Sequence, residues 1–211
     1  MAIKAYTGIM GSGKTYEVVS EVIRIALSQG RRVVSNIAGL NYVAFVDLLV
    51  EDGANPEHIG ELLAVDHEQV KDPLFWRTDK CESDGIQTII QPGDLVVLDE
   101  IWRFWEGFSP KDSDGKKMPD RVKNFFRMHR HMVHPGTGVT CDMAVICQDI
   151  MDAHRGLRSV IEETYLMTKL TVIGSASRYR VDIFQRASVR GKPSRSLQRT
   201  YNSRYFPLYS S

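Results

Sequence analysis

The stretch Gly8-Ile9-Met10-Gly11-Ser12-Gly13-Lys14-Thr15 fits the pattern G-x-x-x-x-G-K-[ST] at every fixed position and is the strongest indication of the fold. Glycines in such a loop let backbone amides converge on a phosphate at a helix N-terminus, where the helix dipole also favours negative charge. We expect Lys14 to reach the β- and γ-phosphates of ATP and the Thr15 hydroxyl to ligate Mg²⁺. The residues assigned to nucleotide binding are Gly8, Met10, Gly11, Ser12, Gly13, Lys14, Thr15 and Tyr16.

The sequence on both sides of this loop fits a βαβ unit. Residues 3–7 read as a short strand, and residues 14–29 carry apolar side chains at helical spacing. Gly30 suits the position that follows a helix, and residues 31–37 are β-branched and apolar, as in a buried strand. These features predict an α/β protein, a three-layer P-loop NTPase with a central, mostly parallel sheet.

Further elements follow along the chain. We expect strands at residues 94–100 and 143–148, helices at residues 41–51 and 119–131, and another helix that closes at residues 160–163. A polar, glycine-bearing stretch at residues 109–118 is typical of a mobile loop. Two β-rich runs, 164–173 and 178–186, predict a hairpin appended to the sheet. The domain is expected to span residues 1–187, with 188–211 as a basic tail or linker.

The bulk properties describe an ordinary globular protein. The chain has 211 residues and a formal net charge of +1, so overall charge does not argue for a nucleic-acid or membrane partner. Its three cysteines form no CxxC pair, which disfavours a zinc site or a disulfide framework. No stretch approaches the ~18 apolar residues needed to span a bilayer. We expect a soluble chain in a reducing cytosol.

An apolar run that ends in two carboxylates, Asp99 and Glu100, has the form of a Walker B strand. Asp99 would hold the Mg²⁺ ion directly or through water. Glu100 would polarise the attacking water as a general base. The alternative for Glu100 is that it caps the helix that follows. The adjacent pair is typical of P-loop ATPases rather than of kinases or GTPases.

Two later residues are candidates for catalysis. Gln148 ends the strand expected at residues 143–148, a position that senses the γ-phosphate in many such ATPases; a loop glutamine is the alternative. Arg158 would act as an arginine finger, often supplied to a neighbouring subunit, with Arg155 as a second candidate. A solvated arginine at a helix start is the alternative for both.

The segment Arg127-Met128-His129-Arg130-His131, with His134 nearby, contains an H-x-H-x-x-H pattern. The flanking arginines add positive charge and no carboxylate lies within the cluster, so a metal site is disfavoured. A basic surface helix that touches phosphates or another subunit is the favoured interpretation.

Taken together, these motifs resemble the zonula occludens toxin family, which includes the assembly ATPase of filamentous bacteriophages. The resemblance runs over residues 3–186, and its distinctive part is the Arg-His segment between the acidic strand and Cys147-Gln148-Asp149. It implies an N-terminal ATPase domain on the cytoplasmic face of the bacterial inner membrane, with a membrane-spanning helix and a periplasmic portion absent from this chain. It also implies phage or envelope proteins as partners, and it gives little support to toxicity.

The resulting hypothesis is ATP hydrolysis that drives phage assembly and export, by a protein that forms homo-oligomers. One rival is an interaction module that binds nucleotide and hydrolyses little. A second rival is a DNA-translocating ATPase, suggested by the basic clusters. A small-molecule kinase is a third, and the adjacent Asp99-Glu100 pair counts against it.

Overall fold

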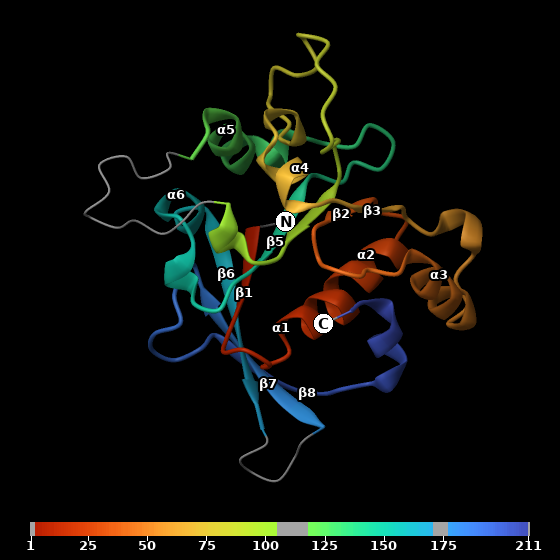
Figure 1. Cartoon of the computed structure of the whole chain (residues 1–211), viewed down its shortest axis with the longest axis vertical. Coiled ribbons are helices and arrows are strands. Elements are labelled where there is room, and N and C mark those ends of the chain that lie inside the picture. Colours follow the sequence, from red (N-terminus) through yellow and green to blue (C-terminus); the bar gives the residue numbers. More distant parts are fainter. Residues whose placement is uncertain (1–2, 105–117, 171–176, 211) are drawn as a thin grey trace.

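A computed structural model of the chain describes residues 3–104, 118–170 and 177–210 (Figure 1). Its centre is an eight-stranded sheet with the order β3-β2-β4-β5-β1-β6-β7-β8. The strands are β1 (Ile3–Thr7), β2 (Val33–Ser35), β3 (Leu62–Ala64), β4 (Leu95–Leu98), β5 (Asp142–Ile146), β6 (Ile161–Lys169), β7 (Arg178–Gln185) and β8 (Arg195–Thr200). Strands β1 to β6 pair in parallel, whereas β7 is antiparallel to β6 and β8 to β7. The α/β prediction with a mostly parallel sheet is confirmed.

Helices connect many of these strands. They are α1 (Lys14–Val18), α2 (Arg24–Ser28), α3 (Tyr42–Glu51), α4 (His67–Lys71), α5 (Asp120–Met128) and α6 (Arg155–Arg158). A π-helical turn at Val19–Ile23 joins α1 to α2, so one continuous helix fills residues 14–28 and ends before Gly30, whose φ is 75°. Short 3-10 helices lie at Pro56–His58, Pro73–Phe75, Ile101–Arg103, His129–His131, Ile150–Asp152 and Ser203–Leu208.

Two hydrophobic cores make the fold a three-layer sandwich. Successive strand residues point to opposite faces of a sheet. Thus Ala5 and Val96 enter the core beneath α5 and α6, while Tyr6 and Val97 enter the core beneath α1, α2 and α3. Figure 1 shows α5 and α6 together on one side of the sheet and α1 to α3 on the other. A fully buried parallel strand needs apolar residues on both faces, which explains the continuous apolar run at β4.

The structure corrects the helix expected to close at residues 160–163. Helix α6 ends at Arg158, and strand β6 begins at Ile161, which pairs with Ile3 of β1. Along β6, Ile161, Thr164, Tyr165 and Met167 are buried and the residues between them are half-buried, which suits a strand that joins the parallel sheet. The predicted hairpin is present as the antiparallel pair β6–β7. The loop expected at residues 109–118 lies outside the described residues, apart from buried Met118.

Part of the segment expected as a basic tail or linker, residues 188–211, extends the sheet. Within it, β8 pairs with β7, and the 3-10 helix Ser203–Leu208 returns over α3. Leu208 is 1% exposed, and Arg204 pairs with Glu51 and Asp52 at the end of α3. Such contacts join residues about 150 positions apart, which no local pattern can reveal. Among the described residues no helix is long and apolar enough to cross a membrane.

Candidate nucleotide site

The phosphate loop lies between β1 and α1, at the edge of the sheet where the parallel strands end. Three of its glycines have positive φ: Gly8 at 140°, Gly11 at 71° and Gly13 at 93°. The Gly8 amide donates to the Gln148 carbonyl at 3.1 Å, and the Thr7 hydroxyl donates to the same carbonyl at 2.8 Å. The loop is therefore anchored to the end of β5, and ligands of open α/β sheets bind at this edge.

Groups that fit a phosphate converge inside this loop. The Lys14 ammonium donates to the carbonyls of Gly8 at 2.9 Å and Ile9 at 3.1 Å, so it lies across the loop. The Ser12 hydroxyl is buried without a partner among the described residues. The first-turn amides of α1 have no acceptor within the helix, as at every helix start. Burial lowers the pKa of Lys14, against the effect of nearby Asp99. An anion in the loop would satisfy these donors.

Met10 and Tyr16 have different positions at the loop. Met10 is 80% exposed at its outer rim, whereas Tyr16 is 4% exposed. The Tyr16 hydroxyl accepts from the Asn202 amide at 2.7 Å, and its ring meets Tyr201 edge-on with the centroids 4.8 Å apart. The Tyr16 side chain thus contacts the C-terminal segment, so any contact of Tyr16 with a nucleotide would come from its backbone.

The acidic strand end lies beside the loop, and Asn36 holds it there. Asn36 follows β2 and is 7% exposed. The Asp99 amide donates to Asn36 Oδ1 at 2.7 Å, and Asn36 Nδ2 donates to the Asp99 carbonyl at 3.1 Å. Burial raises the pKa of Asp99, and the adjacent Lys14 acts to lower it. This role of Asn36 was not among the predictions, although a polar residue at the end of an apolar strand is a signal for it.

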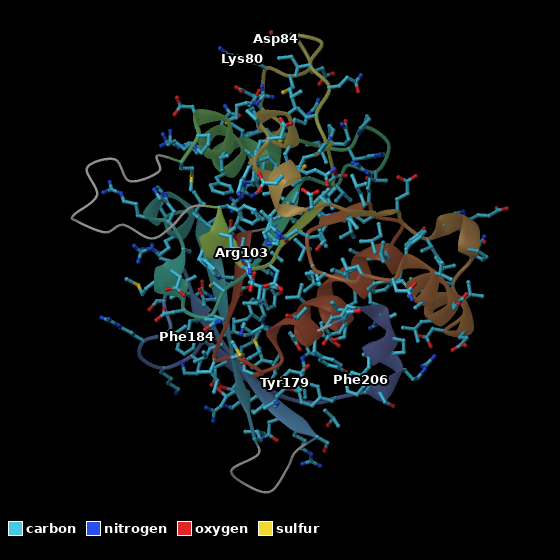
Figure 2. The ribbon with its side chains drawn as sticks, viewed as in Figure 1. Lys80, Asp84, Arg103, Tyr179, Phe184 and Phe206 are labelled. Carbon is cyan, nitrogen blue, oxygen red and sulfur yellow. The ribbon has the colours of Figure 1, made fainter. Side chains whose placement is uncertain are left out.

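Glu100 leaves the strand in a left-handed conformation, with φ 51°. Its amide donates to Asp99 Oδ1 at 2.7 Å, and its side chain makes no capping bond to the 3-10 helix that follows. Instead, the Glu100 carboxylate forms an ion pair with Arg103, three residues on, and both side chains are about half exposed. Arg103, like Asn36, was not among the residues predicted for the site. Figure 2 shows it near the centre of the molecule.

The structure places the remaining candidates at different distances from the loop. Gln148 follows β5 next to the loop, with an exposed side chain. Arg158 lies on α6, on the other face of the sheet, where its Nη1 contacts Met151 Sδ at 2.9 Å. Thr15 stands in the first turn of α1, half-buried. Its hydroxyl and the Asp99 carboxylate are hard oxygen donors, which suit Mg²⁺.

The C-terminal segment forms a wall of this site. A side chain at Gly13 would meet the Tyr201 hydroxyl, which lies 3.5 Å from the Ser12 carbonyl. Arg199 of β8 pairs with Glu17 at 3.1 Å and Glu21 at 2.7 Å. Figure 2 shows Tyr179 and Phe206 on the same side of the molecule, and both rings lie 5.9 Å from that of Tyr16. Residues beyond 188 therefore pack against the helix that follows the phosphate loop.

The sheet order, the phosphate loop and the adjacent acidic strand end define the fold of a P-loop NTPase. Residues 2–211 match the family model of the Zonular occludens toxin (Zot), so the chain belongs to that family.

The chain is similar to several known proteins. It is 28% identical over 204 residues to the Gene 1 protein of Xanthomonas phage phiLf, covering 96% of this chain but 42% of that relative. The N-terminal domain of zonular occludens toxin from Neisseria meningitidis matches with a TM-score of 0.59 and 18% identity, over 99% and 98% of the two chains. The genome-packaging NTPase B204 of Sulfolobus turreted icosahedral virus 2, in complex with ATP-gammaS, matches with a TM-score of 0.52 and 12% identity, over 87% and 92%. These structural likenesses establish the fold.

Proposed function

We propose that this domain binds ATP with Mg²⁺ and hydrolyses it to drive the assembly and export of a filamentous phage. The observation that supports the proposal best is the meeting of two motifs 85 residues apart: Lys14 of the phosphate loop lies close enough to Asp99 for each to shift the other's pKa. The relative from Xanthomonas phage phiLf is about twice as long as this chain, so the work of a whole protein of this kind is part of the proposal.

The residues of this chain would share the reaction as follows. Lys14 leaves its carbonyl partners for the β- and γ-phosphates, and the free loop amides hold the phosphate oxygens. Thr15 and Asp99 would hold Mg²⁺, which neutralises charge on the phosphate oxygens when bound. Glu100 takes a proton from the attacking water, whose oxygen bonds to the γ-phosphorus as the bond to ADP breaks. Gln148 would sense the γ-phosphate, and Arg158 would reach a neighbouring subunit as a finger.

We also propose a setting for this activity. The domain would act as a homo-oligomer on the cytoplasmic face of the bacterial inner membrane, in keeping with the family resemblance, and a membrane segment of the whole protein would hold it there. Residues 188–211 would then carry the connection from the nucleotide site toward that segment. Phage assembly or envelope proteins would be the partners.

The test is phosphate release from ATP and Mg²⁺ over a range of protein concentrations, with Glu100→Gln as the variant. We expect turnover that rises with concentration and falls at least about a hundredfold in the variant, which keeps its ATP affinity because the phosphate loop is intact. Equal turnover in the two proteins would remove Glu100 as the base.

One observation favours a second function, a nucleotide-binding module that hydrolyses little. Because the Glu100 carboxylate is paired with Arg103, it is not free to accept a proton in this state. Arg103→Gln separates the two functions. A several-fold rise in phosphate release would show that the ion pair holds back a competent base, whereas unchanged, negligible release with normal ATP binding would favour the binding module.

A further inference from the structure

A cleft between α5, α6 and the start of β6 gathers six basic residues. One cavity of about 820 Å³ is lined by four arginines and a single carboxylate, that of Glu162. A second cavity of about 330 Å³ shares Phe126, Arg127, Ser159 and Val160 with the first. We call the two together the basic cleft. Its cationic residues are Lys123, Arg127, Arg130, Arg155, Arg158 and Arg186.

The basic cleft is strongly positive, whereas the whole chain is nearly neutral. The chain has a formal net charge of +1, so the surface outside the cleft is on balance acidic. Like charges gathered in this way repel one another and focus a positive potential in the cleft, which attracts polyanions. Within the described part of the chain, two ion pairs neutralise some of this charge, Glu162 with Arg130 and Asp120 with Lys123.

Several donors in the basic cleft have no acceptor among the described residues. Neither the Arg127 nor the Arg186 side chain forms an ion pair or hydrogen bond there, and both are exposed. The Arg158 Nε is buried without a partner. Arg186 also holds a left-handed backbone, with φ 60°, fixed by bonds from its amide to Glu162 and from Thr164 to its carbonyl. Unmatched guanidinium groups of this kind suit phosphate oxygens.

We propose that the basic cleft binds the phosphodiester backbone of a nucleic acid. Arginine and lysine contacts to phosphates hold such a polymer without reading its sequence. Of the rings in the lining, those of Phe126 and His129 are 2% and 4% exposed, which leaves only the half-buried imidazole of His154 in the described part of the cleft for a base to stack on. A polymer fits better than a single nucleotide, because the cations are spread over two joined cavities rather than gathered around one point.

The basic cleft is separate from the nucleotide site. It lies on the face of the sheet opposite α1, at the end where β6 begins and β7 finishes, whereas the phosphate loop follows the other end of β1. Nucleic-acid binding therefore does not depend on the proposed hydrolysis. Lys14→Ala should abolish ATP binding and leave the cleft unchanged, so a failure of one proposal can be told from a failure of the other.

The experiment is fluorescence anisotropy of labelled oligonucleotides, one single-stranded and one duplex, titrated with the full chain at several salt concentrations. The test variant is the double replacement Arg127→Gln and Arg186→Gln, which leaves the arginine-finger candidate Arg158 untouched. Its matched control is Lys71→Gln with Lys80→Gln, two exposed lysines outside the cleft; Figure 2 shows Lys80 at the outer tip of its loop. Glu162→Gln serves as a variant of the opposite sign, since it removes the one carboxylate that lines the larger cavity.

We expect the arginine variant to bind at least about tenfold more weakly and to lose about 1.4 from the slope of log affinity against log salt, as for two single-strand phosphate contacts. Glu162→Gln should bind several-fold more tightly, because Arg130 is released. Binding of one oligonucleotide only would show whether the cleft takes single strands or duplexes.

Three results would overturn the proposal. The first is no salt-dependent binding by the wild type. The second is an equal loss in the lysine control, which would reduce the effect to bulk charge. The third is an arginine variant that binds oligonucleotide as the wild type does but sediments as a smaller species. That result would make the cleft an interface between copies of this chain.

Discussion

Asn36 and Asp99 form a reciprocal pair of hydrogen bonds across the ends of β2 and β4, through the Asn36 amide group and both backbone polar groups of Asp99. No other side chain would supply both a donor and an acceptor in this plane at that length. We predict that Asn36→Ala lowers the free energy of unfolding by about 1–3 kcal/mol, because the half-buried backbone amide of Asp99 loses its acceptor. Urea unfolding measures this cost.

The same variant tests whether the pair positions Asp99 for its proposed role. Phosphate release should fall at least about tenfold, while ATP affinity measured without Mg²⁺ stays unchanged because the phosphate loop is not touched. If stability falls as predicted and phosphate release does not, the pair only supports the fold.

Gly13 faces Tyr201, so both the backbone conformation of Gly13 and the nearby tyrosine disfavour a larger residue at this position. Its φ of 93° is strained for any other residue, and a methyl group there would meet the Tyr201 hydroxyl. We predict that Gly13→Ala costs about 2–4 kcal/mol of stability, and that adding Tyr201→Phe restores about 1 kcal/mol of it by removing the hydroxyl. A double-mutant cycle from urea unfolding gives the coupling. Strictly additive effects would show that the two residues do not press on each other in solution.

Leu208 tests whether the C-terminal segment belongs to the folded domain. It is 1% exposed in the core formed with α3, whereas Phe206, two residues earlier, is 52% exposed. Leu208→Ala should therefore lower the free energy of unfolding by about 2–4 kcal/mol, and Phe206→Ala by only about 0.5 kcal/mol. Equal, small losses of stability in the two variants would indicate that the residues beyond β8 do not pack on the domain in solution.

Asp94 gives stability a predictable pH dependence. Burial raises the pKa of this carboxyl from 3.8 to about 6, although the Gln91 amide and the Arg32 guanidinium, both 2.8 Å away, act to lower it. The folded chain then binds the proton more tightly than the unfolded chain. The contribution of Asp94 to stability must therefore rise as pH falls from about 6 to about 4, by about 2 kcal/mol.

The measurement for Asp94 is the free energy of unfolding of the wild type minus that of Asp94→Asn, at neutral and mildly acid pH. Subtracting the variant cancels the titration of the other groups. A difference that grows on acidification is expected. A difference that shrinks would mean that the ion pair with Arg32 outweighs burial.

Much of the nucleotide site could be predicted from local pattern. Residues 8–15 are contiguous and specify both the turn and the start of the helix that follows. The strand β4 can be recognised as buried from its own run of apolar residues. The short, half-exposed strand β3 and the strand β8, whose side chains are mostly exposed, carry no such signal. Their pairing with β2 and β7 comes from contacts elsewhere in the chain.

Local sequence alone identifies the class of fold, the phosphate loop and the acidic pair Asp99-Glu100, because each of these features is encoded in a short, continuous stretch of residues. The contacts between distant groups became visible with the three-dimensional structure: Asn36 with Asp99, Tyr201 with Gly13, and Arg127 with Arg186 in the lining of the basic cleft. The order of the strands and the packing of the helices on their two faces fix these meetings, and both arise from the burial of the whole core rather than from any one segment.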